Sequence, residues 1–358
     1  MNEQENPFKY RHEEQFDKDA FFLKLFAPEI IELIPTDALM KRATIFLSTP
    51  GGGKSSLFRI FKPNSLITTI SYQENEEYSE LFGKLKERKI LTNTEPKVLG
   101  IYLSCARNYD ELELLKINPL QQKHLFFSLI NARILLIALH GIMFLKELTK
   151  KDLNKIRIDY PIHVETLPNS PFPCTGEELY QWASNIENSI CDLLDSYEQE
   201  DTKEFGLSDS LDYLHALNPE NITMNGEKIF ETALVMLDDV QFLSKTQHHS
   251  LYSILKSHQI PLPIWLADRR ETLDPNELLP GNEGREFTIV SIEDQFRSKG
   301  KTFENLVKNI ASKRSKAGIL DITDFTQCVD GSILTKEWDE KFKNTSMQIR
   351  KKIETEAQ

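Results

Sequence analysis

The residues best suited to chemistry form one short run near the start of the chain, Ser48-Thr49-Pro50-Gly51-Gly52-Gly53-Lys54-Ser55. An apolar stretch at 43–47 precedes it, and a helical pattern follows. Strand, glycine-rich turn and helix together are the context of a phosphate-binding loop. Backbone N–H groups of such a loop curl around a phosphate, Lys54 can reach the β- and γ-phosphates, and the Ser55 hydroxyl can bind Mg²⁺. We therefore predict that a nucleotide binds to Pro50, Gly51, Gly52, Gly53, Lys54, Ser55 and Ser56.

The run departs from the pattern G-x-x-x-x-G-K-[ST] at its first position, where Ser48 stands in place of glycine. This departure puts the first bend of the loop in question. We expect Gly51, Gly52 and Gly53 to preserve the phosphate cradle, because residues without Cβ tolerate the backbone angles that it needs. The alternative reading is a flexible glycine-rich hairpin with a chance Lys-Ser after it.

Two acids end a second apolar run, Ala233–Val240, and a third acid ends the next run, Pro263–Asp268. A continuous apolar run that delivers carboxylates at its end is typical of a buried parallel strand. We expect Asp238 to support Mg²⁺ opposite Ser55 and Asp239 to orient the attacking water. A buried strand that ends in two acids by chance is the alternative.

Composition narrows the class of protein. The 358 residues suffice for about two domains, and the net charge of −12 gives the chain as a whole no electrostatic attraction to nucleic acid. A local basic run lies at Lys341–Lys352. The four cysteines are scattered without a C-x-x-C pair, which supports neither a zinc site nor a disulfide framework and favours a cytoplasmic location. The polar N-terminus is unlike a signal peptide.

One segment, Leu125–Leu145, is long enough to span a bilayer. It contains Asn131, Arg133 and His140, and an arginine near the centre of a membrane span is costly. We predict a buried helix of a protein outside the membrane.

Alternating strand and helix patterns predict an α/β fold, a parallel sheet flanked by helices. The expected strands are 44–47, 98–103, 233–240, 263–268 and 287–290. Helices are expected at about 121–146, 175–197, 208–217 and 246–257, and the last of these carries His248 and His249, which we expect to be exposed. The expected domains are an N-terminal arm with helices (1–40), a core (41–290) with a helical insertion at about 104–228, and a partial helical lid (291–358).

The second motif carries a resemblance to a known family. The stretch VMLDDVQFLSKTQ at 235–247 resembles the Walker B region of AAA+ ATPases of the initiator and origin-recognition clade. WLADRRETL at 265–273 is similar to the next strand of that family, which ends in a polar sensor residue, here Asp268. The Asp-Asp-Val form also resembles STAND-type signalling NTPases. The likeness spans roughly residues 40 to 300, with the middle third unaligned.

The resemblance implies a P-loop NTPase fold, ATP and Mg²⁺ as cofactors, Asp239 and Asp268 as catalytic residues, and assembly into a homo- or hetero-oligomer. Arg269, Arg270 and Arg285 become candidates for an arginine finger. ATP is favoured over GTP, because the Asn-Lys-x-Asp motif for guanine is absent after the 263–268 strand.

Three functions remain open. The leading hypothesis is a slow Mg²⁺-dependent ATPase that acts as a conformational switch or scaffold for an effector partner, since Asp239 is shorter than the usual glutamate. By analogy alone, its setting would be bacterial DNA maintenance or anti-phage defence. The alternatives are a DNA-loading ATPase of origin-recognition type, against which the net charge counts, and a nucleotide-binding structural subunit without turnover.

Overall fold

The computed structural model describes residues 19–40, 43–159, 171–195, 208–256, 262–270, 287–298 and 306–313. The chain divides into two compact units, a large one from His12 to Phe303 and a small one that combines Met1–Arg11 with Glu304–Gln358. In the small unit the described residues are 306–313, which are helical. The basic run Lys341–Lys352 and the finger candidate Arg285 lie outside the described residues. The domain boundaries set out above remain predictions.

Within the described residues, the core of the large unit is a five-stranded parallel sheet. Its strands follow the order β2 (Val98–Ser104), β7 (Thr232–Asp238), β8 (Ile264–Asp268), β1 (Ala43–Leu47) and β9 (Phe287–Ser291). All five coincide with the predicted apolar runs, and the predicted α/β fold is confirmed. The register pairs Leu47 with Asp268 and Ser104 with Asp238, so the carboxyl ends of the strands meet at one edge.

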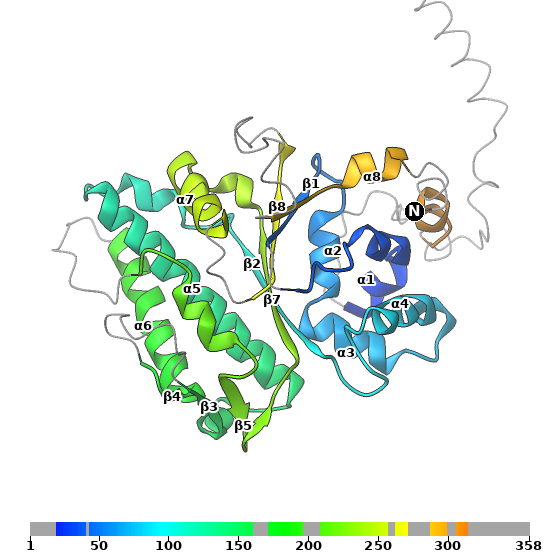
Figure 1. Ribbon diagram of the computed structural model, residues 1–358, viewed down its shortest axis with the longest axis horizontal. Coiled ribbons are helices and arrows are strands. Elements are labelled where there is room, and N and C mark those ends of the chain that lie inside the picture. The colour runs from blue at the N-terminus through cyan, green and yellow to red at the C-terminus, as the bar shows by residue number, and fades with distance from the viewer. Residues whose placement is uncertain are drawn as a thin grey trace, which may run out of the picture. The chain divides into compact units, whose positions relative to one another are not determined.

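Each face of the sheet is covered by its own group of helices (Figure 1). Alternate side chains of each strand point to opposite faces, so the strands contribute to two separate hydrophobic clusters. One face packs against α5 (Pro119–Leu145) and α7 (Lys245–Lys256), and α6 (Gly176–Asp195) packs against α5. The other packs against α1 (Asp19–Leu25), η1 (Pro28–Leu33), α2 (Lys54–Ile60), α3 (Pro63–Ser71) and α4 (Glu76–Glu87).

Helix α5 is the segment that the sequence marked as membrane-like. It is the one described helix that is long and apolar enough to cross a bilayer, and 83% of its most apolar window is buried inside the protein. Its polar residues find partners there: Asn131 Nδ2 donates to Ser210 O (2.8 Å) and Arg133 Nε to Glu187 Oε1 (2.8 Å). The prediction of a buried core helix is confirmed.

The segment between β2 and β7 contains more than helices. A four-stranded antiparallel sheet orders β4 (Cys174–Thr175), β3 (Ile156–Ile158), β5 (Ile222–Met224) and β6 (Glu227–Lys228). None of these short strands was predicted. Short 3-10 helices complete the large unit at η2 (Asp110–Leu114), η3 (Lys150–Lys155), η4 (Asp212–Leu217) and η5 (Val240–Phe242), and α8 (Ile292–Ser298) follows β9.

Candidate nucleotide site

The loop between β1 and α2 has the backbone of a cradle. Gly51 (φ +83°) and Gly53 (φ +89°) adopt left-handed angles that favour glycine, and Gly53 caps α2. Gly52 lies against Ser48: a Cβ at position 52 would come within 2.5 Å of Ser48 Oγ. The serine therefore fits because residue 52 is glycine. Pro50 is exposed on the loop, whereas Ser56 is buried in the first turn of α2.

Lys54 lies back across this loop. Its Nζ donates to Ser48 O (2.7 Å) and to Ser48 Oγ (2.6 Å). Burial lowers the pKa of Lys54, and the negative charges of Asp238 and Glu293 oppose that effect. The oxygens of a bound phosphate would replace Ser48 O and Ser48 Oγ as acceptors of Lys54. An ammonium group suits this role because it binds phosphate as a compact charge with three donors.

Asp238 ends β7 and is 1% exposed. Tyr102 Oη donates to its Oδ2 (2.8 Å), and the backbone N–H of Asp239 donates to its Oδ1 (2.9 Å). Burial raises the pKa of Asp238, and the neighbouring hydroxyls of Ser55 and Tyr102 act in the opposite direction. The fold thus brings Asp238 close to Ser55, the residue with which we expected it to bind Mg²⁺.

Asp239 turns the chain sharply at the end of the strand. Its backbone is left-handed (φ 59°, ψ 31°), a conformation that aspartate tolerates better than most residues. Ser104 Oγ donates to its Oδ2 (2.9 Å) and Gln241 Nε2 to its Oδ1 (3.2 Å). The side chain is half-buried and held in place by these two partners.

Asp268 ends β8, between β7 and β1, and is completely buried. His248 Nε2 lies 2.7 Å from its Oδ2, Tyr252 Oη donates to the same oxygen (2.9 Å), and the backbone N–H of Arg269 donates to Oδ1 (2.7 Å). The prediction that His248 is exposed was wrong, because the ring turns inward to this carboxylate. Its neighbour His249 is exposed as expected.

The arginines differ in their surroundings. Arg269 is half-buried, and its charge is one of the effects that lower the pKa of Lys54, which places it on the side of the phosphate loop. Arg270 is exposed and its Nη1 lies 3.6 Å from Asp294 Oδ2.

Sequence reasoning missed several residues of the site. Tyr102 and Ser104 lie at the end of the predicted second strand, so the rule that parallel strands deliver side chains to one edge could have found them. Glu293 follows the last strand: its Oε1 accepts from Thr49 N (2.6 Å) and Thr49 Oγ1 (2.9 Å). Burial raises the pKa of Glu293, but these bonds and Lys54 outweigh it and the net pKa is lowered.

The donors at this edge fit Mg²⁺. The ion binds one or two protein oxygens, and phosphate and water complete its shell. Ser55 and Asp238 can supply the protein oxygens. Among the described residues, no group of three or more His, Cys, Asp and Glu side chains could hold a metal ion by itself.

The parallel sheet and the helices that flank it define an α/β fold of the P-loop NTPase class. A family model described as ORC-CDC6-like matches residues 6–358, nearly the whole chain, so the chain belongs to the ORC-CDC6-like family. The predicted resemblance to origin-recognition and initiator-like AAA+ P-loop ATPases is thereby confirmed. No curated protein and no solved structure matches the chain.

Proposed function

We propose that this chain binds ATP–Mg²⁺ at the β1–α2 loop and hydrolyses it slowly, as a conformational switch or scaffold for a partner. The observation that carries the proposal is the closeness of the Ser55 hydroxyl to the Asp238 carboxylate, which brings the loop to the acid-bearing strand. In this arrangement Gly51–Ser55 bind the phosphates, and Ser55 and Asp238 hold Mg²⁺, which would neutralise phosphate charge. Asp239 and Asp268 stand beside them for the attacking water.

Asp239 is the candidate for the proton-accepting group. In hydrolysis, the water oxygen bonds to the γ-phosphorus, the bond to the bridging oxygen breaks, and a proton passes to a carboxylate. Both oxygens of Asp239 accept hydrogen bonds, from Ser104 and Gln241. Each carboxylate oxygen keeps a second lone pair, so Asp239 can still take a proton from water while these two bonds fix its orientation.

The test is steady-state turnover of the wild type beside Asp239→Ala, with ATP binding measured on both. We expect the substitution to lower kcat by about 100-fold or more, the usual contribution of a general base, and to leave ATP affinity within about twofold. Binding without turnover in both proteins would refute the enzymatic activity. It would leave the third hypothesis, a nucleotide-binding structural subunit.

Switching implies a partner, which we propose to be a further copy of the chain or an effector protein. Assembly is typical of AAA+ proteins, and the mass of the protein in solution with and without ATP tests it. The cytoplasm as location, and DNA maintenance or anti-phage defence in bacteria as setting, belong to this proposal and rest on analogy.

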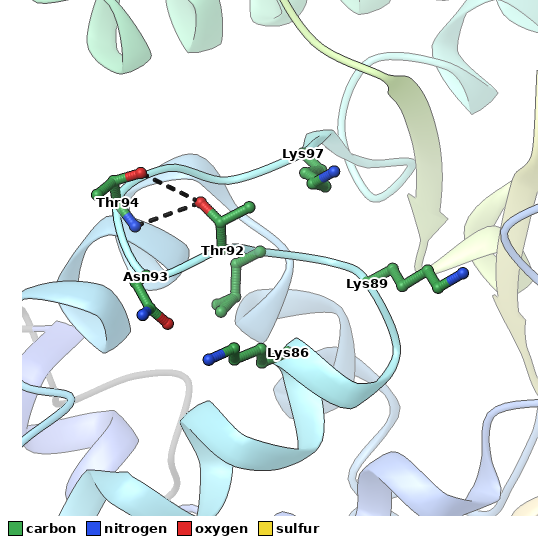
Figure 2. A pocket seen from close by; sticks show the side chains of 7 residues that line it. Lys86, Lys89, Thr92, Asn93, Thr94 and Lys97 are labelled. Atoms are coloured by element: carbon green, nitrogen blue, oxygen red, sulfur yellow. Dashed lines mark hydrogen bonds between the residues drawn. The ribbon is translucent and has the colours of Figure 1, made fainter.

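A DNA-loading ATPase is the second candidate, and one local feature favours it. Lys86, Lys89 and Lys97 line a surface pocket beside the turn 92–94, at the end of α4 (Figure 2). Clustered lysines can contact phosphates even on an acidic protein. Duplex DNA added to the turnover assay separates the candidates, because a DNA-loading ATPase would be stimulated and the switch would not.

A further inference from the structure

Helix α7 makes a polar contact with the sheet through two residues one turn apart. His248 and Tyr252 both reach Oδ2 of Asp268, at 2.7 and 2.9 Å. Their rings stack, with centroids 4.4 Å apart and planes at 20°. Positions i and i+4 share one helix face, so the pair acts as a single polar unit in an otherwise apolar interface.

The carboxylate that they contact must have such partners. Asp268 has no exposed surface, and a buried carboxylate without hydrogen bonds strongly destabilises the folded protein. Two donors on Oδ2 and the backbone N–H of Arg269 on Oδ1 together fix the rotation of the carboxylate about its Cβ–Cγ bond. With Asp268 ionised, His248 is the donor and carries its proton on Nε2, because a carboxylate only accepts.

The same helix is connected to the other acid. Asp239 leads through η5 directly into α7, so the helix begins six residues after the acid. Its first turn is tied to the segment after β2, where Gln247 Nε2 donates to Tyr109 O. Helix α7 is therefore connected to both acids: to Asp239 by the intervening chain, and to Asp268 by the side chains of His248 and Tyr252.

We propose that His248 and Tyr252 are positioning residues, which hold the Asp268 carboxylate in the orientation that the hydrolytic step requires. The proposal rests on the proposed ATPase function and adds two residues to it. Neither residue touches the nucleotide: each acts through Asp268. Their loss therefore affects the reaction step and not the binding of ATP.

Four variants test the proposal: His248→Ala, His248→Gln, Tyr252→Phe and, as a matched control, His249→Ala. Glutamine returns an N–H donor near the position of Nε2, and phenylalanine keeps the packing while it removes the hydroxyl. His249 is the exposed neighbour on the same helix. ATP turnover is expressed per nucleotide-binding site, measured by titration of each variant, so that partly unfolded protein does not enter kcat.

We expect His248→Ala and Tyr252→Phe to lower kcat about tenfold or more, because small errors in the placement of reacting groups have effects of this size. The Kd for ATP should stay within about twofold, His248→Gln should recover most of the lost kcat, and His249→Ala should match the wild type. If His248→Ala does not fold, Tyr252→Phe and His248→Gln decide.

Two kinds of result would overturn the proposal. Unchanged kcat in both His248→Ala and Tyr252→Phe, or weakened ATP affinity at unchanged kcat, refutes the positioning role and leaves the ATPase intact. A wild type that binds ATP without turnover refutes the ATPase itself, and the positioning role falls with it.

Discussion

Lys54→Ala should abolish detectable ATP binding. The ammonium group of Lys54 lies over the loop on acceptors that phosphate oxygens would replace. Hydrogen bonds to charged groups contribute about 1.5–3 kcal/mol each, so the loss of two such bonds should weaken binding by about 100-fold or more. Displacement of a fluorescent ATP analogue measures this effect directly.

Lys97→Ala is the matched control for this substitution. It also removes one positive charge, but its Nζ pairs with Glu231 Oε1 (2.6 Å) in a solvent-exposed ion pair at the start of β2. Exposed pairs contribute little to stability, so Lys97→Ala should bind ATP like the wild type. Equal ATP affinity in Lys54→Ala and the wild type would show that the β1–α2 loop is not the nucleotide site.

Gly100→Ala should be among the most destabilising single substitutions in the chain. Gly100 lies in β2, where a Cβ would meet the carbonyl oxygen of Phe61 at 1.8 Å and its carbon at 2.7 Å. Both are backbone atoms at the end of α2, so the helix must move away from the sheet. We expect a loss of about 3 kcal/mol or more in the free energy of unfolding, measured by urea denaturation.

Gly83→Ala is the control for Gly100→Ala. Gly83 is exposed in α4, and a Cβ there meets nothing within 4 Å. Alanine is favoured over glycine inside a helix, so this variant should gain up to about 1 kcal/mol. Because α2 carries Lys54 at its other end, Gly100→Ala should also weaken ATP binding. A Gly100→Ala protein with wild-type stability would mean that α2 does not pack against β2 as described.

The main sheet could be predicted because its strands are buried on both faces. Runs such as those of β7 and β8 are apolar at almost every position. This pattern can be recognised in the sequence without knowing which strands lie beside them. The small antiparallel sheet could not be found in this way. Strands of two or three residues, such as β4 and β6, are too short to show a period.

The site was predictable where its residues form motifs and unpredictable where they meet through the fold. Lys54, Ser55 and Asp238 belong to local patterns that the sequence displays. His248 was misjudged because its partner, Asp268, lies on a different element. A helix pattern shows which face is apolar but not that a histidine on this face faces a buried acid.

Titration of the wild-type protein with ATP, in Mg²⁺ and again in EDTA, tests the central claim most directly. Isothermal calorimetry gives both the stoichiometry and the affinity. The arrangement of Ser55 and Asp238 predicts one ATP per chain and clearly weaker binding in EDTA, because both residues would act on the nucleotide through the metal. The absence of ATP binding in Mg²⁺, or the same affinity in both buffers, would contradict the ATP–Mg²⁺ site.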